Sequence, residues 1–360
     1  MLRLALAVLM LATPMAFAAG KVSIFNWPDY MAPDTLSNFQ RQTGIDTQYS
    51  IFDSNETLEK RLRESPGKYD VIFPSNHFMN RHISVGNLKP LDRSRLPNWK
   101  YLNPALLRAL EINDPGNRYG FPYLWGFSGI GYNVQQVKAA LGDDAPVDSW
   151  DLVFKPENIA RLKKCGVAIL DIGPELLPMA LNYLGLPSHS QNPADYDKAR
   201  ALLLSIKPYV RYFDSVEYSH QLAEGKLCAV IGFSGDILQA QTQARQARQA
   251  NQGVDIEFTL PREGSTMWFD MVAIPADAPD EDAAYTFLNY LLDPKVMANI
   301  TNSVHYANGN EGADEWVDPA IKGDLRIYPS AEVMSKLFLL QPMPADIEQL
   351  RTRIWNQIRH

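Results

Sequence analysis

Three short segments of the sequence place an aromatic residue close to a carboxylate. They are Trp27-Pro28-Asp29-Tyr30, Phe233-Ser234-Gly235-Asp236 and Trp268-Phe269-Asp270. A carboxylate accepts charge-assisted hydrogen bonds from ammonium groups, and an aromatic face attracts a cation and covers a methylene chain. The pairing therefore suits an organic cation as ligand. Each segment taken alone is equally consistent with core packing by the ring and helix capping by the Asp.

The sequence carries none of the motifs that usually mark catalysis. It has no GxSxG, no GxxxxGK[ST], no HExxH and no GxGxxG that follows a strand. The six His residues show no metal-ligand spacing, so neither a metal nor a cofactor is expected. Cys165 and Cys228 are expected to form one disulfide in an oxidising compartment, with two buried free thiols as the alternative. We therefore expect a binding protein without enzymatic activity.

The N-terminus predicts secretion. Arg3 precedes an apolar stretch from Leu4 to Ala12, and small residues follow up to Ala19. A positive start, a short apolar run and an Ala-x-Ala site are typical of a signal peptide, so we expect residues 1–18 to be removed. The apolar run is too short to span a bilayer. The alternative, a buried N-terminal helix, agrees less well with this order of residues. The expected location is the periplasm.

Length and charge limit the number of domains and the kinds of partner. The chain has 360 residues, with 34 Lys and Arg against 41 Asp and Glu, a net charge of −7. About 340 residues after cleavage exceed the roughly 250–300 at which one core usually splits, so two lobes are expected. The acidic balance and the lack of a Lys/Arg cluster argue against nucleic acid and anionic membrane as partners.

Alternating strands and helices are expected to position the three segments. Strands are predicted at 21–27, 45–52 and 69–73, with helices starting near Asp34 and Ser54 between them. This β-α-β-α-β order predicts a parallel sheet covered by helices. Ligands of such sheets bind at the carboxyl ends of the strands. Trp27 and, after a predicted strand at 227–232, Phe233 fall at such ends.

Two segments are expected to cross between the lobes. The Gly-rich and aromatic-rich stretch 119–133 predicts an extended strand that leaves the first lobe, and 256–260 predicts a second crossing strand. Lobe one is accordingly expected to contain residues 19–125 and 247–300, and lobe two residues 126–246 and 301–360. The polar stretch that begins at Gln239 is expected to form a solvated surface helix.

Together these stretches resemble the periplasmic polyamine-binding proteins, the putrescine and spermidine receptors of ABC importers. The resemblance extends over nearly all of the chain after residue 18, and its most specific stretches are FNWPDYMAPDTLSNFQRQTGI, YDVIFPSNHF, PYLWGFSGIGYN, IGFSGD and WFDMVAIPADA. It implies an α/β fold of the two-lobed periplasmic-binding-protein type (type II), with discontinuous lobes joined by two crossing strands. It also implies delivery of the ligand to an inner-membrane ABC permease, and we expect a monomer.

Carried over position by position, the resemblance implies nine ligand-binding residues. Lobe one would supply Trp27, Asp29, Ser75, Trp268 and Asp270, and lobe two would supply Glu175, Phe233, Asp236 and Tyr306. The carboxylates would bind the terminal ammonium groups, and the aromatic rings would enclose the methylene chain. Asp171 is the alternative to Glu175, because the segment LDIGPELLP departs from the family pattern.

Departures from the family pattern leave more than one ligand identity open. Pro28 stands where putrescine receptors commonly have Ser, and Phe233 stands where they commonly have Trp. Trp268 resembles the residue that spermidine-preferring members have at the same position, so we expect spermidine to bind at least as tightly as putrescine. The alternatives are another organic cation such as agmatine, a polyamine sensor for a signalling receptor, and an enzyme of a similar two-lobed fold.

Overall fold

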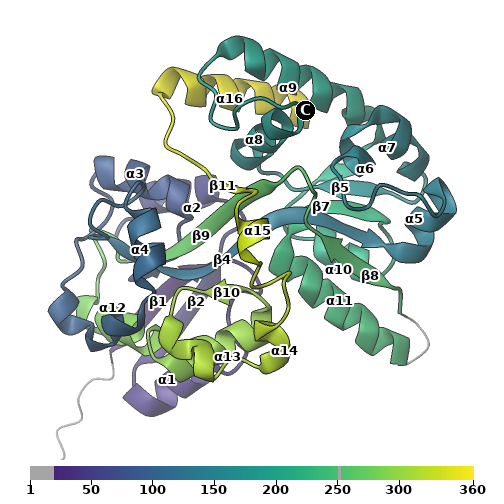
Figure 1. The fold of residues 1–360 in the computed structure, drawn as a ribbon. Coiled ribbons are helices and arrows are strands. Elements are labelled where there is room, and N and C mark those ends of the chain that lie inside the picture. The colour runs from purple at the N-terminus through teal and green to yellow at the C-terminus, as the bar shows by residue number, and fades with distance from the viewer. Residues whose placement is uncertain (1–19, 250–252) are drawn as a thin grey trace, which may run out of the picture.

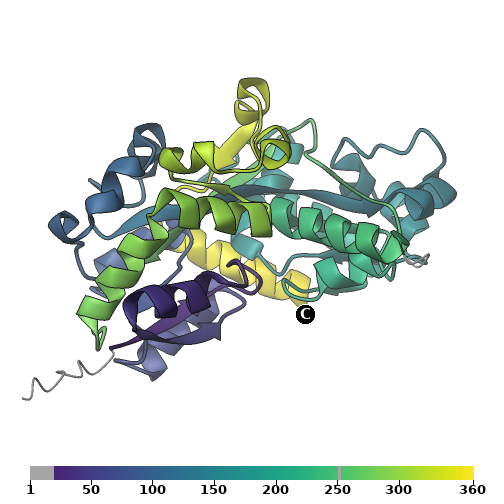
Figure 2. The ribbon, with the colours of Figure 1, turned by 90° about the horizontal axis from the view of Figure 1, so that it is seen from below.

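One sheet of eleven strands runs through both halves of the described part of the chain. The computed structural model describes residues 20–249 and 253–360, so the expected signal peptide, residues 1–18, lies outside the described residues. The strand order is β2-β1-β3-β9-β4-β7-β5-β6, with β8 and β10 also paired to β4, and β11 paired to β9. Helices cover the sheet in both halves of the molecule (Figure 1). In Figure 2 the two lobes lie side by side, the purple, blue and lime elements of lobe one beside the teal elements of lobe two.

Lobe one combines N-terminal elements with a part of the C-terminal half. β1 pairs in parallel with β2 and β3, and β9 lies antiparallel to β3 and β4. Its elements are β1 (Lys21–Asn26), α1 (Thr35–Thr43), β2 (Asp46–Ile51), α2 (Asn55–Glu64), β3 (Val71–Ile72), α3 (Asn76–Ser84), α4 (Pro104–Leu110), β9 (Ser265–Ala273), α12 (Glu281–Leu291), α13 (Pro294–Val304), β10 (Ala307–Asn308), α14 (Pro319–Lys322), α15 (Ala331–Met334) and β11 (Leu337–Leu339).

Lobe two is built mainly from the middle of the chain, with the C-terminal helix packed on it. β7 is its central strand and pairs in parallel with β5. The elements are α5 (Val134–Leu141), α6 (Asp151–Phe154), α7 (Pro156–Leu162), β5 (Val167–Ile169), α8 (Gly173–Tyr183), α9 (Pro193–Ile206), β6 (Tyr212–Phe213), α10 (Tyr218–Ala223), β7 (Ala229–Phe233), α11 (Ser234–Gln249), β8 (Ile256–Thr259) and α16 (Ala345–Arg359).

Local sequence signals account for several helix boundaries. The Ser54 hydroxyl accepts a hydrogen bond from the Thr57 N–H at the start of α2, as expected of a capping residue. Gly44 ends α1 in the left-handed conformation, with φ of 75°. The Asp280 side chain caps α12 by accepting from the Ala283 N–H. The predicted strands and helices of the first 75 residues are therefore confirmed.

The strand β4 (Gly120–Asn133) is shared by both lobes. Its first half pairs with β9, from Gly120↔Ala273 to Phe127↔Met267. Its second half pairs with β7 and β8, beginning at Ser128↔Phe233. The predicted crossing strand at 119–133 is therefore confirmed. The second crossing lies a little later than predicted, because β8 remains beside the second half of β4 and the chain returns to lobe one through residues 260–264.

The packing places two segments differently from the expected lobe boundaries. β8 pairs within lobe two, whereas Val304, Tyr306 and Ala313 are buried in the same core as Val22 and Phe39 of lobe one. The helix α16 packs on α8 and α9 of lobe two. We therefore propose that lobe one contains residues 20–127 and 265–339, and that lobe two contains residues 128–249, 253–259 and 345–359.

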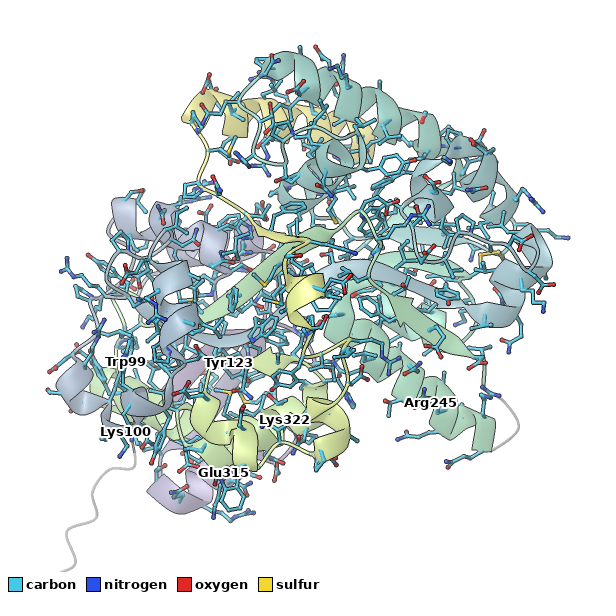
Figure 3. All side chains as sticks on the ribbon, in the orientation of Figure 1. Trp99, Lys100, Tyr123, Arg245, Glu315 and Lys322 are labelled. Atoms are coloured by element: carbon cyan, nitrogen blue, oxygen red, sulfur yellow. A yellow bond between two sulfur atoms is a disulfide. The ribbon has the colours of Figure 1, made fainter. Side chains whose placement is uncertain are left out.

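The helix α11 is not fully solvated, in contrast to the expectation. Ala240, Gln241 and Ala244 are buried, while Arg245 lies on the outer face of the helix (Figure 3). From Gln239 onward the buried face contains two small alanine side chains and one glutamine, which allow close packing without a wide apolar stripe. The Gln241 side-chain amide is also satisfied, since it donates to the Ile256 carbonyl at 2.6 Å. The prediction of a solvated surface helix is therefore wrong for this face.

The expected disulfide joins Cys165 to Cys228 in lobe two. Their Cα atoms lie 5.5 Å apart, and the two residues are separated by 63 positions in the sequence. The bond ties the end of α7 to the start of β7. The disulfide prediction is confirmed.

Replacing both Cys165 and Cys228 by Ala should lower the free energy of unfolding by about 4 kcal/mol, because the unfolded chain is no longer constrained by a loop of this length. Denaturant unfolding of the oxidised wild type and of the double variant measures this difference. The reduced wild type is the matched control and should resemble the variant. Equal stability of the oxidised wild type and the variant would contradict the prediction.

Candidate functional site

A cavity of about 330 Å³ lies between the two lobes, and all nine residues expected to bind a ligand line it. Its walls are strongly acidic. Among the described residues that line the cavity, seven carry a carboxyl group and none is Lys or Arg; the seven are Asp29, Asp53, Glu56, Asp171, Glu175, Asp236 and Asp270. The structure therefore brings together side chains from widely separated parts of the sequence, as the position-by-position comparison predicts.

The strand β9 presents Trp268 and Asp270 to the cavity. The two residues are two positions apart on one strand, so their side chains point to the same face. The Ser75 hydroxyl donates to Asp270 Oδ1 at 2.7 Å, and the Asn55 amide in turn donates to the Ser75 hydroxyl at 3.0 Å. Asp270 is only 4% exposed. Burial raises the pKa of its carboxyl to about 7, although the Ser75 hydrogen bond acts in the opposite direction.

Aromatic rings form the remaining walls. Trp268 lies edge-on to Phe233 and to Tyr306, with ring centroids 5.3 and 5.4 Å apart. Trp27 follows the last residue of β1, and its indole N–H donates to the Phe73 carbonyl at 2.8 Å, which fixes the plane of the ring. A methylene chain in the cavity would therefore meet ring faces and edges held by their neighbours.

Asp236 joins the two lobes. Tyr306, which follows α13 of lobe one, donates its hydroxyl to Asp236 Oδ1 at 2.5 Å, and Tyr218 of lobe two donates to Oδ2 at 2.7 Å. Burial raises the pKa of Asp236, and the two phenol hydrogen bonds oppose this rise. The carboxylate lies in the first turn of α11, where the partial positive charge of the helix N-terminus also favours its ionised form.

Glu175 and Asp171 differ in their partners. Glu175 is 6% exposed and accepts one hydrogen bond, from the Ser128 hydroxyl at 3.3 Å. Burial raises the pKa of Glu175 to about 8, and the negative charge of Asp270 adds to the rise. Asp171 instead accepts from the Trp355 indole at 2.8 Å and forms an ion pair with Arg359 at 2.8 Å. Of the two alternatives, Glu175 is therefore the carboxyl group that lacks a cationic partner.

Asp29 lies at the edge of the cavity. Its side chain is 70% exposed, and its Oδ2 is 3.6 Å from Nε2 of His220 on α10 of lobe two. Its backbone has a φ of 48°, a conformation that Asp adopts more readily than most residues. Asp29 and His220 therefore face each other from opposite lobes.

Several lining residues were missed by sequence reasoning. One face of α11 enters the cavity with Asp236, Gln239, Ala240 and Gln243, whose spacing of three, four and seven residues from Asp236 is the available sequence signal. His77, one of the six His residues without metal-ligand spacing, also lines the cavity; burial lowers its pKa to about 3. The other missed residues include Asp53, Glu56 and His220, and no local motif distinguishes them.

Residues 35–326 match the family described as bacterial extracellular solute-binding protein. The chain belongs to this family. The putrescine-binding periplasmic protein SpuD of Pseudomonas aeruginosa is 49% identical to this solute-binding protein over 336 residues, which cover 93% of this chain and 91% of the relative. A putrescine/agmatine-binding protein of Pseudomonas aeruginosa is 45% identical over 342 residues, covering 95% of this chain and 92% of that relative.

A solved structure shows the same architecture. The spermidine/putrescine ABC transporter substrate-binding protein PotD of Streptococcus pneumoniae superposes with a TM-score of 0.74 at 28% identity, covering 94% of this chain and 98% of that chain. The match confirms the predicted periplasmic-binding-protein fold for this solute-binding protein. Together with the family, it confirms the predicted resemblance to polyamine receptors and the expectation of a binding protein in place of an enzyme.

The described residues of this solute-binding protein contain neither a membrane-spanning helix nor a metal-binding cluster. Within residues 20–249 and 253–360, no helix has the length and apolar character needed to cross a membrane. In the same ranges, no three His, Cys, Asp or Glu side chains are grouped so that they could hold a metal ion.

Proposed function

We propose that this solute-binding protein captures putrescine between its lobes in the periplasm and delivers it to an ABC permease of the inner membrane. The observation that carries the proposal is the cavity between the lobes, whose described lining residues include seven carboxyl groups and no Lys or Arg. The names of the relatives, which include periplasmic putrescine binding and an ABC transporter, support it.

The charges of the cavity call for a cationic ligand. Asp270, Glu175 and Asp236 are held by neutral hydroxyl donors, and burial raises the pKa of all three. An isolated buried carboxylate is unfavourable, so each group gains when an ammonium ion enters. A diamine stays doubly protonated at neutral pH, because alkylammonium groups titrate near the Lys value of about 10.4. Its two charges can therefore be shared among these three carboxylates.

The aromatic walls suit the carbon chain between the two ammonium groups. Trp27, Phe233, Trp268 and Tyr306 would replace water around the methylenes, at about 0.8 kcal/mol for each buried CH₂. Cation–π contacts with the same rings add roughly 0.5–2 kcal/mol. A micromolar complex requires about 8 kcal/mol in total, a value that these contributions and the charge pairs can reach after the costs of association.

The ligand would also hold the lobes together. Asp29, Trp268 and Asp270 belong to lobe one, whereas Glu175 and Asp236 belong to lobe two. A cation that contacts both sets favours the arrangement in which the lobes approach each other. We propose that the protein acts as a monomer and has no nucleic-acid partner, in keeping with its net charge of −7.

Putrescine is the first candidate for the ligand that binds most tightly. The relatives with 49% and 45% identity both carry putrescine in their names, so we set it ahead of spermidine, against the order expected from Trp268. Agmatine is the second candidate, because the name of one of these relatives includes it. Its guanidinium group could form bidentate hydrogen bonds with a cavity carboxylate.

Calorimetric titration of the protein lacking residues 1–18 tests the proposal. We expect putrescine to bind with micromolar or tighter affinity, and agmatine and spermidine to bind more weakly. Butylamine, which keeps the carbon chain but has a single ammonium group, is the matched control. It should bind at least 100-fold more weakly, since one charge pair is missing. Absence of binding by all three polycations would contradict the proposed function.

A further inference from the structure

The C-terminal helix α16 controls the charge of one carboxylate in the cavity wall. Asp171 lines the cavity, and both of its side-chain oxygens are occupied from α16: the Trp355 indole donates to Oδ1 and the Arg359 guanidinium binds Oδ2, each at 2.8 Å. The side chain of Asp171 is 18% exposed and that of Arg359 is 50% exposed. Arg359 therefore reaches Asp171 from the outer side of the wall and neutralises it.

The position of α16 is fixed against the start of α8. The Trp355 ring packs so closely on Gly173 that a Cβ at this position would collide with it. The Arg351 guanidinium donates to the Pro174 carbonyl, and its side chain is only 6% exposed. Because Glu175 lies in the same turn, α16 supports the part of lobe two that presents both Asp171 and Glu175 to the cavity.

The charge on Asp171 matters because other carboxylates are near. Glu56 of α2 lines the same cavity from lobe one. Burial raises the pKa of Glu56, and the negative charge of Asp171 contributes to the rise. The positive charge of Arg81 opposes the rise at Glu56. Without Arg359, Asp171 would lose its own ion-pair partner while Glu175 and Glu56 line the same cavity.

We propose that Arg359 is a built-in counter-ion that sets how many ammonium groups the cavity accepts. By pairing with Asp171 it takes one of the seven cavity carboxylates out of the set that attracts ammonium groups. The attraction for a third ammonium group is thereby lowered, so a diamine is favoured over a triamine. This inference rests on the proposed polyamine function and adds a specificity-determining residue that lies outside the aromatic and carboxylate set. Arg359 acts through Asp171 and is a positioning residue.

The affinities for spermidine and putrescine in Arg359→Gln test the inference. We expect the ratio of spermidine to putrescine affinity to rise about tenfold, at the low end of the range for close charge pairs across interfaces. Arg353→Gln is the matched control, because Arg353 is exposed on the same helix and the variant loses the same charge. Its ratio should equal that of the wild type.

Two more variants separate a charge effect from a defect in α16. Arg359→Lys keeps the positive charge and should keep the wild-type ratio. Asp171→Asn combined with Arg359→Gln removes the carboxylate and should return the ratio to the wild-type value. Three results would each overturn the inference. The first is a spermidine-to-putrescine ratio in Arg359→Gln within twofold of the control, and the second is an equal loss of affinity for both ligands. The third is a raised ratio that persists in the double variant. A wild type that binds neither amine would overturn the proposed function as well, whereas normal putrescine binding with an unchanged ratio refutes only the role of Arg359.

Discussion

Asp270→Asn is expected to weaken putrescine binding by about 2–5 kcal/mol, which corresponds to at least 30-fold in affinity. Asp270 is a buried carboxyl of lobe one that lines the cavity, and Ser75 and Asn55 hold it by a chain of hydrogen bonds. An Asn keeps the shape and can still accept from Ser75, but it offers no charge to an ammonium group. Calorimetric titration of wild type and variant measures the difference.

The stability of the ligand-free variant is an internal check on this prediction. Because burial already raises the pKa of Asp270 to about 7, a neutral side chain should fit this position at little cost. Thermal unfolding without ligand should therefore be unchanged or shifted upward, which excludes misfolding as the cause of weak binding. Asp144→Asn, at an exposed position of lobe two, is the matched control and should bind normally. A loss below about 1 kcal/mol would show that Asp270 does not contact the ligand.

Putrescine affinity is expected to fall at least 100-fold between pH 8 and pH 5. Asp270 and Glu175 have pKa values raised to about 7 and about 8 in the ligand-free protein, so both carry protons over much of this range. An ammonium ion binds their ionised forms, and binding must displace these protons. The amine itself does not change charge in this window. Calorimetry in buffers of different ionisation enthalpy should therefore detect proton release on binding near pH 7.

The stability of the ligand-free protein should change with pH in the opposite direction. Raised folded-state pKa values mean that the native protein binds more protons than the unfolded chain between about pH 4.5 and pH 8. The contribution of Asp270 and Glu175 to stability is therefore greatest below this window and is lost as the pH rises through the folded-state values. Glu175→Gln should flatten both pH profiles. An affinity that is constant between pH 5 and pH 8 would contradict this account of the cavity.

Local sequence patterns predict much of the fold of this protein. The strands and helices up to Ser75 follow from alternation, capping residues and Gly44, and β4 follows from an uncharged Gly-rich and aromatic stretch. These features depend on neighbours in the sequence, so a single chain reveals them. The placement of β8 and of the segment after residue 300 depends on contacts with distant strands, and no local pattern distinguishes the two lobes for such segments.

The candidate site likewise has a part that the sequence predicts and a part that it does not. The three aromatic–carboxylate segments contain six of the nine expected residues, and the resemblance to a family adds Ser75, Glu175 and Tyr306. The structure places all nine in one cavity. Their role in binding remains a prediction. The face of α11 was missed because an alanine and glutamine helix resembles a solvated one. The pairing of Asp171 with Trp355 spans 184 positions and leaves no trace in the sequence around either residue.

The sharing of β4 between the lobes bears on how fast a ligand can leave. The hydrogen-bonded ladder changes partner between Phe127 and Ser128, from β9 to β7 and β8, without a break in the strand. Lobes joined in this way separate by bending a continuous ribbon and cannot swing freely on a loop. We expect the stiffness of that ribbon to contribute to the barrier to release, and dissociation rates differ among related complexes more than association rates do. Residence time would then depend on β4 as well as on the side chains around the cavity.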